Sequence, residues 1–274
     1  MRPTDRRLLA GVWTLLLVVS VAGSAVAMGP GIEQSGSAPE IESTVAGAQS
    51  AGDPIVQTHR YALTPDRPGS VRVRLSYELP DRVQSLETGL LSVATVTDTD
   101  GFDRVNDTTY EWDESTSTPS LTVRYAVNET ATRTGPEAAD GRYLFADVGE
   151  WALFTRLRTR SSWRYTGGSE PVTIDRRART AGPGAVGDRI VYLGGVSVTE
   201  RRADGQRFRL VVPEAAALSE SPEAILDSLA GASRSLRIGD RDERVVAFAA
   251  PTTQVEWAVR GLATGDAEFW TRDF

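Results

Sequence analysis

The sequence predicts a mainly β protein, an antiparallel sandwich or saddle-like sheet, followed by a small and incomplete α/β unit. Three observations lead to this fold class. Short segments alternate apolar and polar residues with the period of two that a half-buried strand requires. Clusters of Gly, Pro and Asp separate these segments, and a single helix signal follows after residue 205. An apolar segment near the N-terminus also predicts a hydrophobic helix ahead of the folded part.

Residues 1–27 have the layout of a signal peptide or a membrane anchor. Three arginines within the first seven residues precede the apolar run 8–21, and small residues follow up to Ala27, the candidate cleavage position. No charged residue occurs between Arg7 and Glu33, so about 20 residues could instead span a bilayer. Both alternatives predict that the rest of the chain is exported, on the extracellular side. Residues 28–53 are rich in Gly, Ser, Ala and Pro, which predicts a flexible linker.

Residues 54–202 form the predicted β-rich domain. Segment 71–77 places its valines, leucine and tyrosine on one side of a strand and Arg72, Arg74 and Ser76 on the other, which predicts a buried face and an arginine face. Segment 121–127 repeats the alternation. The predicted strands of this domain are 55–63, 71–77, 90–97, 110–112, 121–127, 142–148, 151–155, 172–174, 189–192 and 196–201.

Residues 206–274 predict the start of an α/β unit. A strand at 208–212 ends at Pro213, and Ser221, Pro222 and Glu223 are typical of a helix N-terminus, which predicts a helix over 222–236. An apolar strand over 244–249 follows, with further strands at 255–262 and 268–270. Because a strand–helix–strand unit of this size cannot cover both faces of its sheet, we expect it to be part of a larger domain.

Composition narrows the function classes. The chain has 274 residues, a formal net charge of -7, one histidine, no cysteine, and no lysine among its 30 basic residues. This pattern is typical of proteins from halophilic archaea, although a GC-rich genome would also favour arginine. The negative balance argues against a nucleic-acid partner. Without cysteine there are no disulfides, thiolate metal sites or cysteine nucleophiles.

Few residues stand out as candidates for chemistry or modification. The single histidine, His59, lies on a predicted strand, and we expect a structural role for it because no nucleophile motif accompanies it. Asn106 and Asn128 begin N-glycosylation sequons. The arginines of 176–179 could contact anionic lipid headgroups, but we expect a solvated loop there. Catalytic, cofactor-binding and metal residues are not identified.

Five segments resemble exported haloarchaeal proteins related to gluzincin metallopeptidases, the wider group of M1 aminopeptidase-like and thermolysin-like enzymes. They are LSYELPD at 75–81, TYEWD at 109–113, VVAFAAP at 245–251, VEWAVRGL at 255–262 and GDAEFW at 265–270.

The resemblance implies an N-terminal β domain followed by a catalytic domain in which a His-Glu-x-x-His helix binds zinc. That motif is absent from this chain, so zinc is expected only if a longer product carries it. The resemblance also implies that Glu268 lies on an edge strand beside the substrate; a solvent-facing strand residue is the alternative.

The sequence therefore favours the non-catalytic N-terminal portion of a gluzincin-like zinc peptidase, either exported or tethered to a membrane through its N-terminal segment. Its expected partners are a peptide or protein substrate, or a missing catalytic half. The alternative is a non-catalytic cell-surface binding or adhesion module that acts through its β domain.

Overall fold

The computed structural model describes residues 53–127, 144–167, 170–235, 244–252, 254–257, 259–265 and 267–274. The N-terminal segment with Ala27, nearly all of the expected linker, and Asn128 lie outside these residues. The described part is mainly β with a single well-defined helix, which confirms the predicted fold class. None of its helices has the length and apolar character needed to cross a bilayer.

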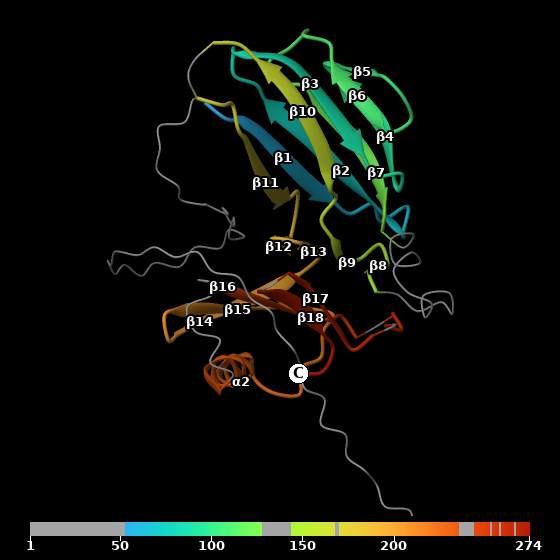
Figure 1. The fold of residues 1–274 in the computed structure, drawn as a ribbon. Coiled ribbons are helices and arrows are strands. Elements are labelled where there is room, and N and C mark those ends of the chain that lie inside the picture. Colours follow the sequence, from blue (N-terminus) through green and yellow to red (C-terminus); the bar gives the residue numbers. More distant parts are fainter. Residues whose placement is uncertain are drawn as a thin grey trace, which may run out of the picture.

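Two sheets form a β sandwich in the upper part of Figure 1. The first sheet has the order β11-β1-β2-β7-β4, and only its β1–β11 pair is parallel. The second sheet has the order β10-β3-β6-β5 and is antiparallel. The strands of the first sheet are β1 (Ile55–Ala62), β2 (Ser70–Glu78), β4 (Ala94–Asp100), β7 (Ser120–Ala126) and β11 (Ile174–Thr180), and those of the second are β3 (Val83–Leu90), β5 (Phe102–Arg104), β6 (Thr109–Trp112) and β10 (Thr159–Tyr165).

The inner faces of the sandwich pack as the alternation requires. Val71, Val73, Leu75 and Tyr77 of β2 are fully buried, whereas the residues between them point outward. The Tyr77 ring meets Phe102 of the other sheet edge-on, with ring centroids 5.6 Å apart. Its hydroxyl lies 2.9 Å from the Thr88 hydroxyl oxygen, so the polar end of this buried tyrosine has a partner across the sandwich.

A third sheet, of order β12-β13-β9-β8, lies between the sandwich and the rest of the molecule (Figure 1). Every residue of β13 is buried, as expected for a strand that is covered on both faces. Its strands are β8 (Ala146–Asp147), β9 (Ala152–Thr155), β12 (Gly184–Val186) and β13 (Ile190–Leu193).

The fourth sheet has the order β14-β15-β16-β18-β17. Strands β15, β16 and β18 run parallel, and α2 (Pro222–Ser235) makes the crossover from β15 to β16. The helix begins where the sequence predicts, because the Ser221 hydroxyl accepts a 3.2 Å bond from the Ala224 amide. The strands are β14 (Val196–Ala203), β15 (Gln206–Pro213), β16 (Arg244–Ala249), β17 (Gly261–Gly265) and β18 (Glu268–Thr271).

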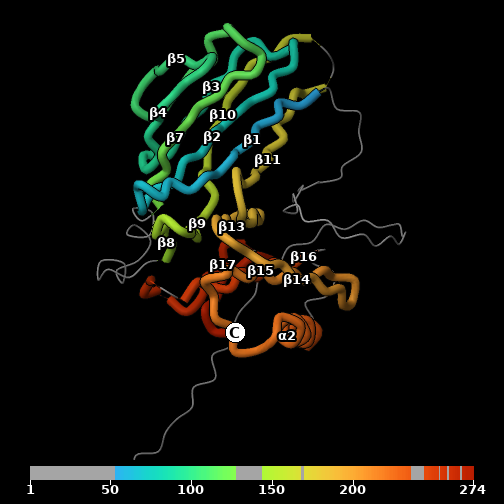
Figure 2. The backbone as a smooth tube through the Cα atoms, turned by 180° about the vertical axis from the view of Figure 1, so that it is seen from behind, coloured from blue at the N-terminus to red at the C-terminus, as the bar shows by residue number. Residues whose placement is uncertain are grey.

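The two faces of this five-stranded sheet have different neighbours. One face joins the main core through Val211, Val246, Phe248 and Trp270. The other face packs against α2 and forms a smaller core that includes Phe208. Figure 1 shows the sheet edge-on below the sandwich, with α2 beneath it, and Figure 2 shows the same layers from behind. By sheet membership, the second structural unit begins at β14.

Several predicted strands differ from the structure. Strands β3, β5, β10 and β12 were not predicted, because polar residues and Gly dilute their apolar periodicity. The strand predicted at 172–174 lies instead at β11, so the arginines of 176–179 belong to a strand and the prediction of a loop is wrong. Of the described residues in the segment predicted at 255–262, only 261 and 262 are in a strand, β17. Pairing with a neighbouring strand, which no local pattern reveals, accounts for these differences.

Replacing Phe248 with Ala tests whether the core is continuous across the sheets. Phe248 is fully buried on the face toward the sandwich. The loss should be about 3–5 kcal/mol of unfolding free energy, and the far-ultraviolet and tryptophan signals should still change in one transition. Phe269→Ala is the matched control, because this phenylalanine lies on the other face and is only partly buried. Equal losses for the two variants, measured by urea unfolding, would contradict a shared core.

Candidate functional site

The candidate site is the contact between Glu268 and the turn that precedes β13. Glu268 lies opposite Val246 in the β18–β16 pair, so its side chain points to the sandwich side of the sheet. It is only 3% exposed. A carboxylate in that position must find hydrogen-bond donors, because burying an unpaired charge is costly.

Backbone amides of the turn 187–190 supply those donors. The Arg189 amide donates to Oε2 at 2.5 Å and the Ile190 amide donates to Oε1 at 2.9 Å. The Gly187 amide closes the turn by donating to the Ile190 carbonyl oxygen at 2.8 Å. A Cβ at Gly187 would lie 1.9 Å from Oε1, so any other residue there would displace the carboxylate. Glu268 and Gly187 therefore form one fitted contact between β18 and the third sheet.

Charged groups surround this contact. Asp188 pairs with Arg244 of β16 at 2.8 Å, and the Arg156 guanidinium donates to the Asp188 carbonyl oxygen at 3.1 Å. Burial raises the pKa of Glu268 to about 7, although the two amides oppose the rise. The Asp188 charge raises this pKa further and the Arg244 charge lowers it. The carboxyl group therefore titrates near neutral pH.

This geometry supports a structural latch more directly than a substrate contact. Both Glu268 oxygens are occupied by main-chain donors, and the side chain faces the third sheet. The resemblance implied a position beside the substrate, with a solvent-facing residue as the alternative. In the structure the carboxylate does not reach solvent, because it closes the junction between two sheets.

A second carboxylate shows the same kind of burial at the other end of the third sheet. Asp147 of β8 is only 2% exposed, and its Oδ1 accepts a 2.9 Å bond from the Gly149 amide. Burial raises the pKa of Asp147 to about 6. Neither Asp147, nor Asp188, nor the turn at 187–190 was expected from the sequence. A lone Glu in the apolar strand 268–270 is the only local signal of such a contact.

His59 lies on the inner face of β1, inside the sandwich. Its Nδ1 is 3.3 Å from the Tyr61 hydroxyl, and the side chain is buried. Burial, with Arg156 and Arg176 nearby, lowers the pKa of His59 to about 3, so the imidazole is neutral at physiological pH. Its surroundings agree with the structural role that we expected.

In the part of the chain that the structure describes, the residues do not fit a zinc site. No cluster of three His, Cys, Asp or Glu side chains able to hold a metal occurs in the described ranges. The single histidine is enclosed by the sandwich core, and a tetrahedral zinc site needs nitrogen, sulfur or carboxylate ligands that converge on one point.

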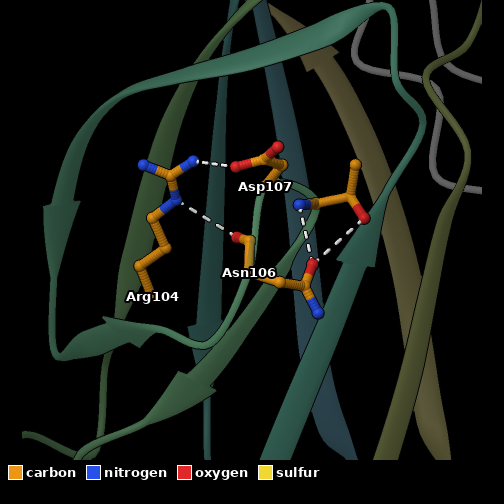
Figure 3. A network of polar contacts seen from close by, with 4 residues as sticks. Arg104, Asn106 and Asp107 are labelled. Atoms are coloured by element: carbon orange, nitrogen blue, oxygen red, sulfur yellow. Dashed lines mark hydrogen bonds and ion pairs between the residues drawn. The ribbon is translucent and has the colours of Figure 1, made fainter.

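Asn106 lies in the exposed loop between β5 and β6. Figure 3 shows its side-chain oxygen accepting from Thr108, whose amide is 3.0 Å away and whose hydroxyl is 3.4 Å away. Arg104 holds the loop from the other side, because its Nε donates to the Asn106 carbonyl oxygen at 3.2 Å and its guanidinium pairs with Asp107. The Asn106 side-chain nitrogen is left available for modification. Asn128, the other sequon, is not among the described residues.

A search of solved structures finds matches among zinc metallopeptidases, all at low sequence identity. An aminopeptidase N family protein from Idiomarina loihiensis aligns over 79% of this chain at 10% identity, with a TM-score of 0.45. An M1 zinc metallopeptidase from Deinococcus radiodurans aligns over 79% at 10% identity, with a TM-score of 0.39. A two-domain M1 zinc metallopeptidase variant bound to L-tryptophan aligns over 81% at 13% identity, with a TM-score of 0.40.

These likenesses concern the fold. The aligned part of this chain corresponds to 42% of the Idiomarina protein and to 59% and 60% of the other two, so it spans less than two thirds of each. No protein-family model and no curated protein matches the sequence.

Replacing Glu268 with Gln tests the latch through its titration. The folded-state pKa of about 7 lies above the ordinary value of 4.5, so the folded state binds this proton more tightly than the unfolded state does. The stability that the proton confers is present below the ordinary pKa and is lost as pH rises through 7. Between about pH 6.5 and 8.5 the wild-type free energy of unfolding should fall by roughly 1 kcal/mol.

Glu268→Gln should flatten that slope, as measured by urea unfolding at several pH values. This window avoids His59 and most of the Asp147 titration, because their pKa values are about 3 and about 6. Asp147→Asn is the matched control and should keep most of the slope. An unchanged slope in Glu268→Gln would assign the titration to another group.

Proposed function

We propose that this chain is the exported or membrane-tethered, non-catalytic N-terminal portion of a gluzincin-like zinc metallopeptidase. In this proposal, a catalytic half with a His-Glu-x-x-His helix packs on the α2 side of the five-stranded sheet. That half is either a further part of the same polypeptide or a separate one. The bound peptide substrate then lies between the two halves.

The observation that carries the proposal is the uneven cover of this sheet. Sheets with parallel strands are normally buried on both faces. Here one face is part of the main core, whereas among the described residues α2 packs on the other face mainly over β14 and β15. Val245 and Phe269, on β16 and β18, lie on the second face and are each only partly buried. We call the surface formed by Val245, Phe269 and Phe274 the open face.

The positions of the family-like segments support the same assignment. The segments at 245–251 and 265–270 supply β16 and β18, which pair directly through Val246 and Glu268. Glu268 then locks β18 to the turn before β13, so the sheet and the sandwich form one platform. A rigid platform of this kind suits a part that positions a partner and carries no reacting group itself.

Zinc chemistry in this proposal belongs to the catalytic half. The described residues hold no metal-ligand cluster, and the chain has one histidine and no cysteine. Zinc would activate water in the half that carries the His-Glu-x-x-His helix.

The alternative is a non-catalytic cell-surface binding or adhesion module. The outer face of the first sandwich sheet favours this alternative, because its exposed arginines outnumber its acidic residues. The two functions are compatible if the sandwich anchors the complex while the five-stranded sheet holds the catalytic half.

The proposal predicts where peptidase activity resides. The purified chain, supplied with zinc, should not hydrolyse peptides in a chelator-sensitive way, whereas a complex with a polypeptide carrying the His-Glu-x-x-His helix should. Sequencing the native locus beyond the codon for Phe274 shows whether the same gene encodes that polypeptide. If it does not, the polypeptide must be sought among other genes. Chelator-sensitive hydrolysis by this chain alone would overturn the proposal.

A surface substitution then tests the open face. Phe269→Asp should weaken association with the catalytic half at least tenfold, because a charge would face an apolar partner. Val105→Asp is the matched control, since this residue is exposed, at 55%, on the β5–β6 loop of the sandwich. Titration with the purified catalytic half measures both variants, and equal affinities would remove the open face from the proposal.

Export predicts a glycan on Asn106. Because Asn106 and Thr108 are hydrogen-bonded on an exposed loop, the native protein should gain mass at this residue. Asn106→Gln should abolish the added mass and Thr108→Ser should retain it, as measured by peptide mass spectrometry of protein from the native host. An unmodified Asn106 in protein recovered from the cell surface would contradict this prediction.

A further inference from the structure

Arginines gather on the outer face of the first sandwich sheet. This sheet, β11-β1-β2-β7-β4, buries alternate residues in the core and presents the others outward. Six of the outward residues are arginines, and all six are exposed. We call this surface the arginine face; its arginines are Arg60, Arg72, Arg74, Arg124, Arg177 and Arg179.

The strand register places several of these positive charges directly opposite one another. Arg60 of β1 lies opposite Arg74 on one neighbouring strand and opposite Arg179 on the other. Arg72 of β2 lies opposite Arg124 of β7. Like charges in directly opposed positions destabilise a sheet. The three opposed pairs on this face therefore destabilise the sheet. Exposure to solvent alone gives no reason for arginine at these positions.

Acidic residues do not neutralise the centre of this face. Arg177 pairs with Asp175 at 2.9 Å, and Arg74 donates to the Ser120 hydroxyl at 3.2 Å. Arg60, Arg72 and Arg124 have no ion pair within the described part of the chain. The outward acids lie at the margins: Asp98 and Asp100 on edge strand β4, Glu78 at the end of β2, and Asp175 on edge strand β11.

The opposite side of the sandwich has a different charge pattern. On the second sheet Glu87 lies opposite Glu111, and Glu111 lies opposite Asp103. These three acids form an acidic row, but Arg160 and Arg164 of β10 lie on the same outer face, which therefore carries both signs of charge. The outer face of the first sheet carries six arginines and four acids, so it is the more positive of the two. In a chain of net charge -7, this difference would turn the first sheet toward a negatively charged surface.

We propose that the arginine face docks on an anionic lipid bilayer. The arginines are spread over β11, β1, β2 and β7, so they match an array of phosphates in a plane better than one small anion. Guanidinium groups bind phosphate oxygens in a bidentate manner and are weakly hydrated, which suits a headgroup layer.

The order of the chain agrees with a membrane partner. The apolar run at 8–21 is predicted to lie in or to have crossed a membrane, and the predicted linker leads directly into β1, which carries Arg60. The net charge of the chain opposes a nucleic acid and an anionic bilayer alike, so the predicted membrane segment at 8–21 is what favours the bilayer over a nucleic acid. A second copy of the chain, docking through its acidic row, is the remaining alternative that the test must separate.

The first experiment asks which face meets the bilayer. The chain has no cysteine, so a single Cys can carry a fluorophore without other changes. Thr95→Cys lies opposite Arg124 on the arginine face, and Ser162→Cys lies opposite Glu87 on the other face; both positions are exposed. With phosphatidylcholine–phosphatidylglycerol vesicles that contain a nitroxide headgroup quencher, the label at position 95 should be quenched and that at position 162 should not.

The second experiment asks whether the arginines supply the affinity. Arg72→Gln, Arg74→Gln and Arg124→Gln together should weaken vesicle binding of the full chain about a hundredfold at low salt, at about fivefold per arginine. The matched control replaces Arg104, Arg160 and Arg164, which lie on the second sheet, and changes the net charge equally. The N-terminal segment is the same in both variants, so any binding that it contributes cancels.

Folding and self-association are measured on the same proteins. Replacing the opposed arginines should leave the midpoint of thermal unfolding unchanged or raise it. A loss of vesicle binding would then not reflect a loss of folded structure. Equal loss in both triple variants, stronger quenching at position 162, or no preference for phosphatidylglycerol over pure phosphatidylcholine vesicles would each overturn the proposal. So would concentration-dependent self-association that the arginine-face variant abolishes, because it would assign this face to a second copy.

Discussion

The contact between the five-stranded sheet and the rest of the β structure is the interaction on which this molecule depends. It joins the two units into one core, through Val211, Val246, Phe248 and Trp270 on the sheet side. Trp257 extends the contact, because its ring lies 5.0 Å from that of Trp270 and 6.2 Å from that of Trp151, between centroids. Without this face, the short strand–helix–strand unit would have only the small core beneath α2. The buried Glu268 fixes how the sheets are oriented at this apolar contact, because its two carboxylate oxygens accept hydrogen bonds from two amides of one turn.

Much of this architecture could be predicted from local sequence patterns. The part that could not be predicted depends on contacts between residues that are far apart in the chain. The alternation in β2 and the cap of α2 could be predicted, because burial and capping act on neighbours in sequence. Strand β10 could not, since its Ser and Arg residues become a strand only by pairing with β3. The site around Glu268 could not be predicted for the same reason, because it also depends on residues far apart in the chain. Its two donors lie 79 and 78 residues away in the chain, and no spacing rule connects a carboxylate with main-chain amides of a distant turn.

The same alternation that builds the sandwich core also determines its surfaces. Once Val71 and Val73 are buried, Arg72 and Arg74 must point outward, and the register with β7 brings Arg72 opposite Arg124. The choice of arginine at these outward positions is not dictated by the core, because Ser or Thr would serve the fold without mutual repulsion. The acidic row on the other sheet shows that the chain distributes charge unevenly between its two outer faces. Such a distribution gives the molecule one face that an anionic surface would attract.

The two surfaces discussed above lie on different parts of the molecule, so their occupants need not compete. The open face belongs to the side of the five-stranded sheet that packs on α2, whereas the other side of that sheet is buried against the main core. The arginine face is the outside of a sandwich sheet, beyond that core, as the separation of the layers in Figures 1 and 2 shows. A catalytic half on the open face would therefore leave the arginines exposed. The latch at Glu268 lies between these surfaces, so it would fix the orientation of a partner docked on the open face relative to a bilayer bound at the arginine face.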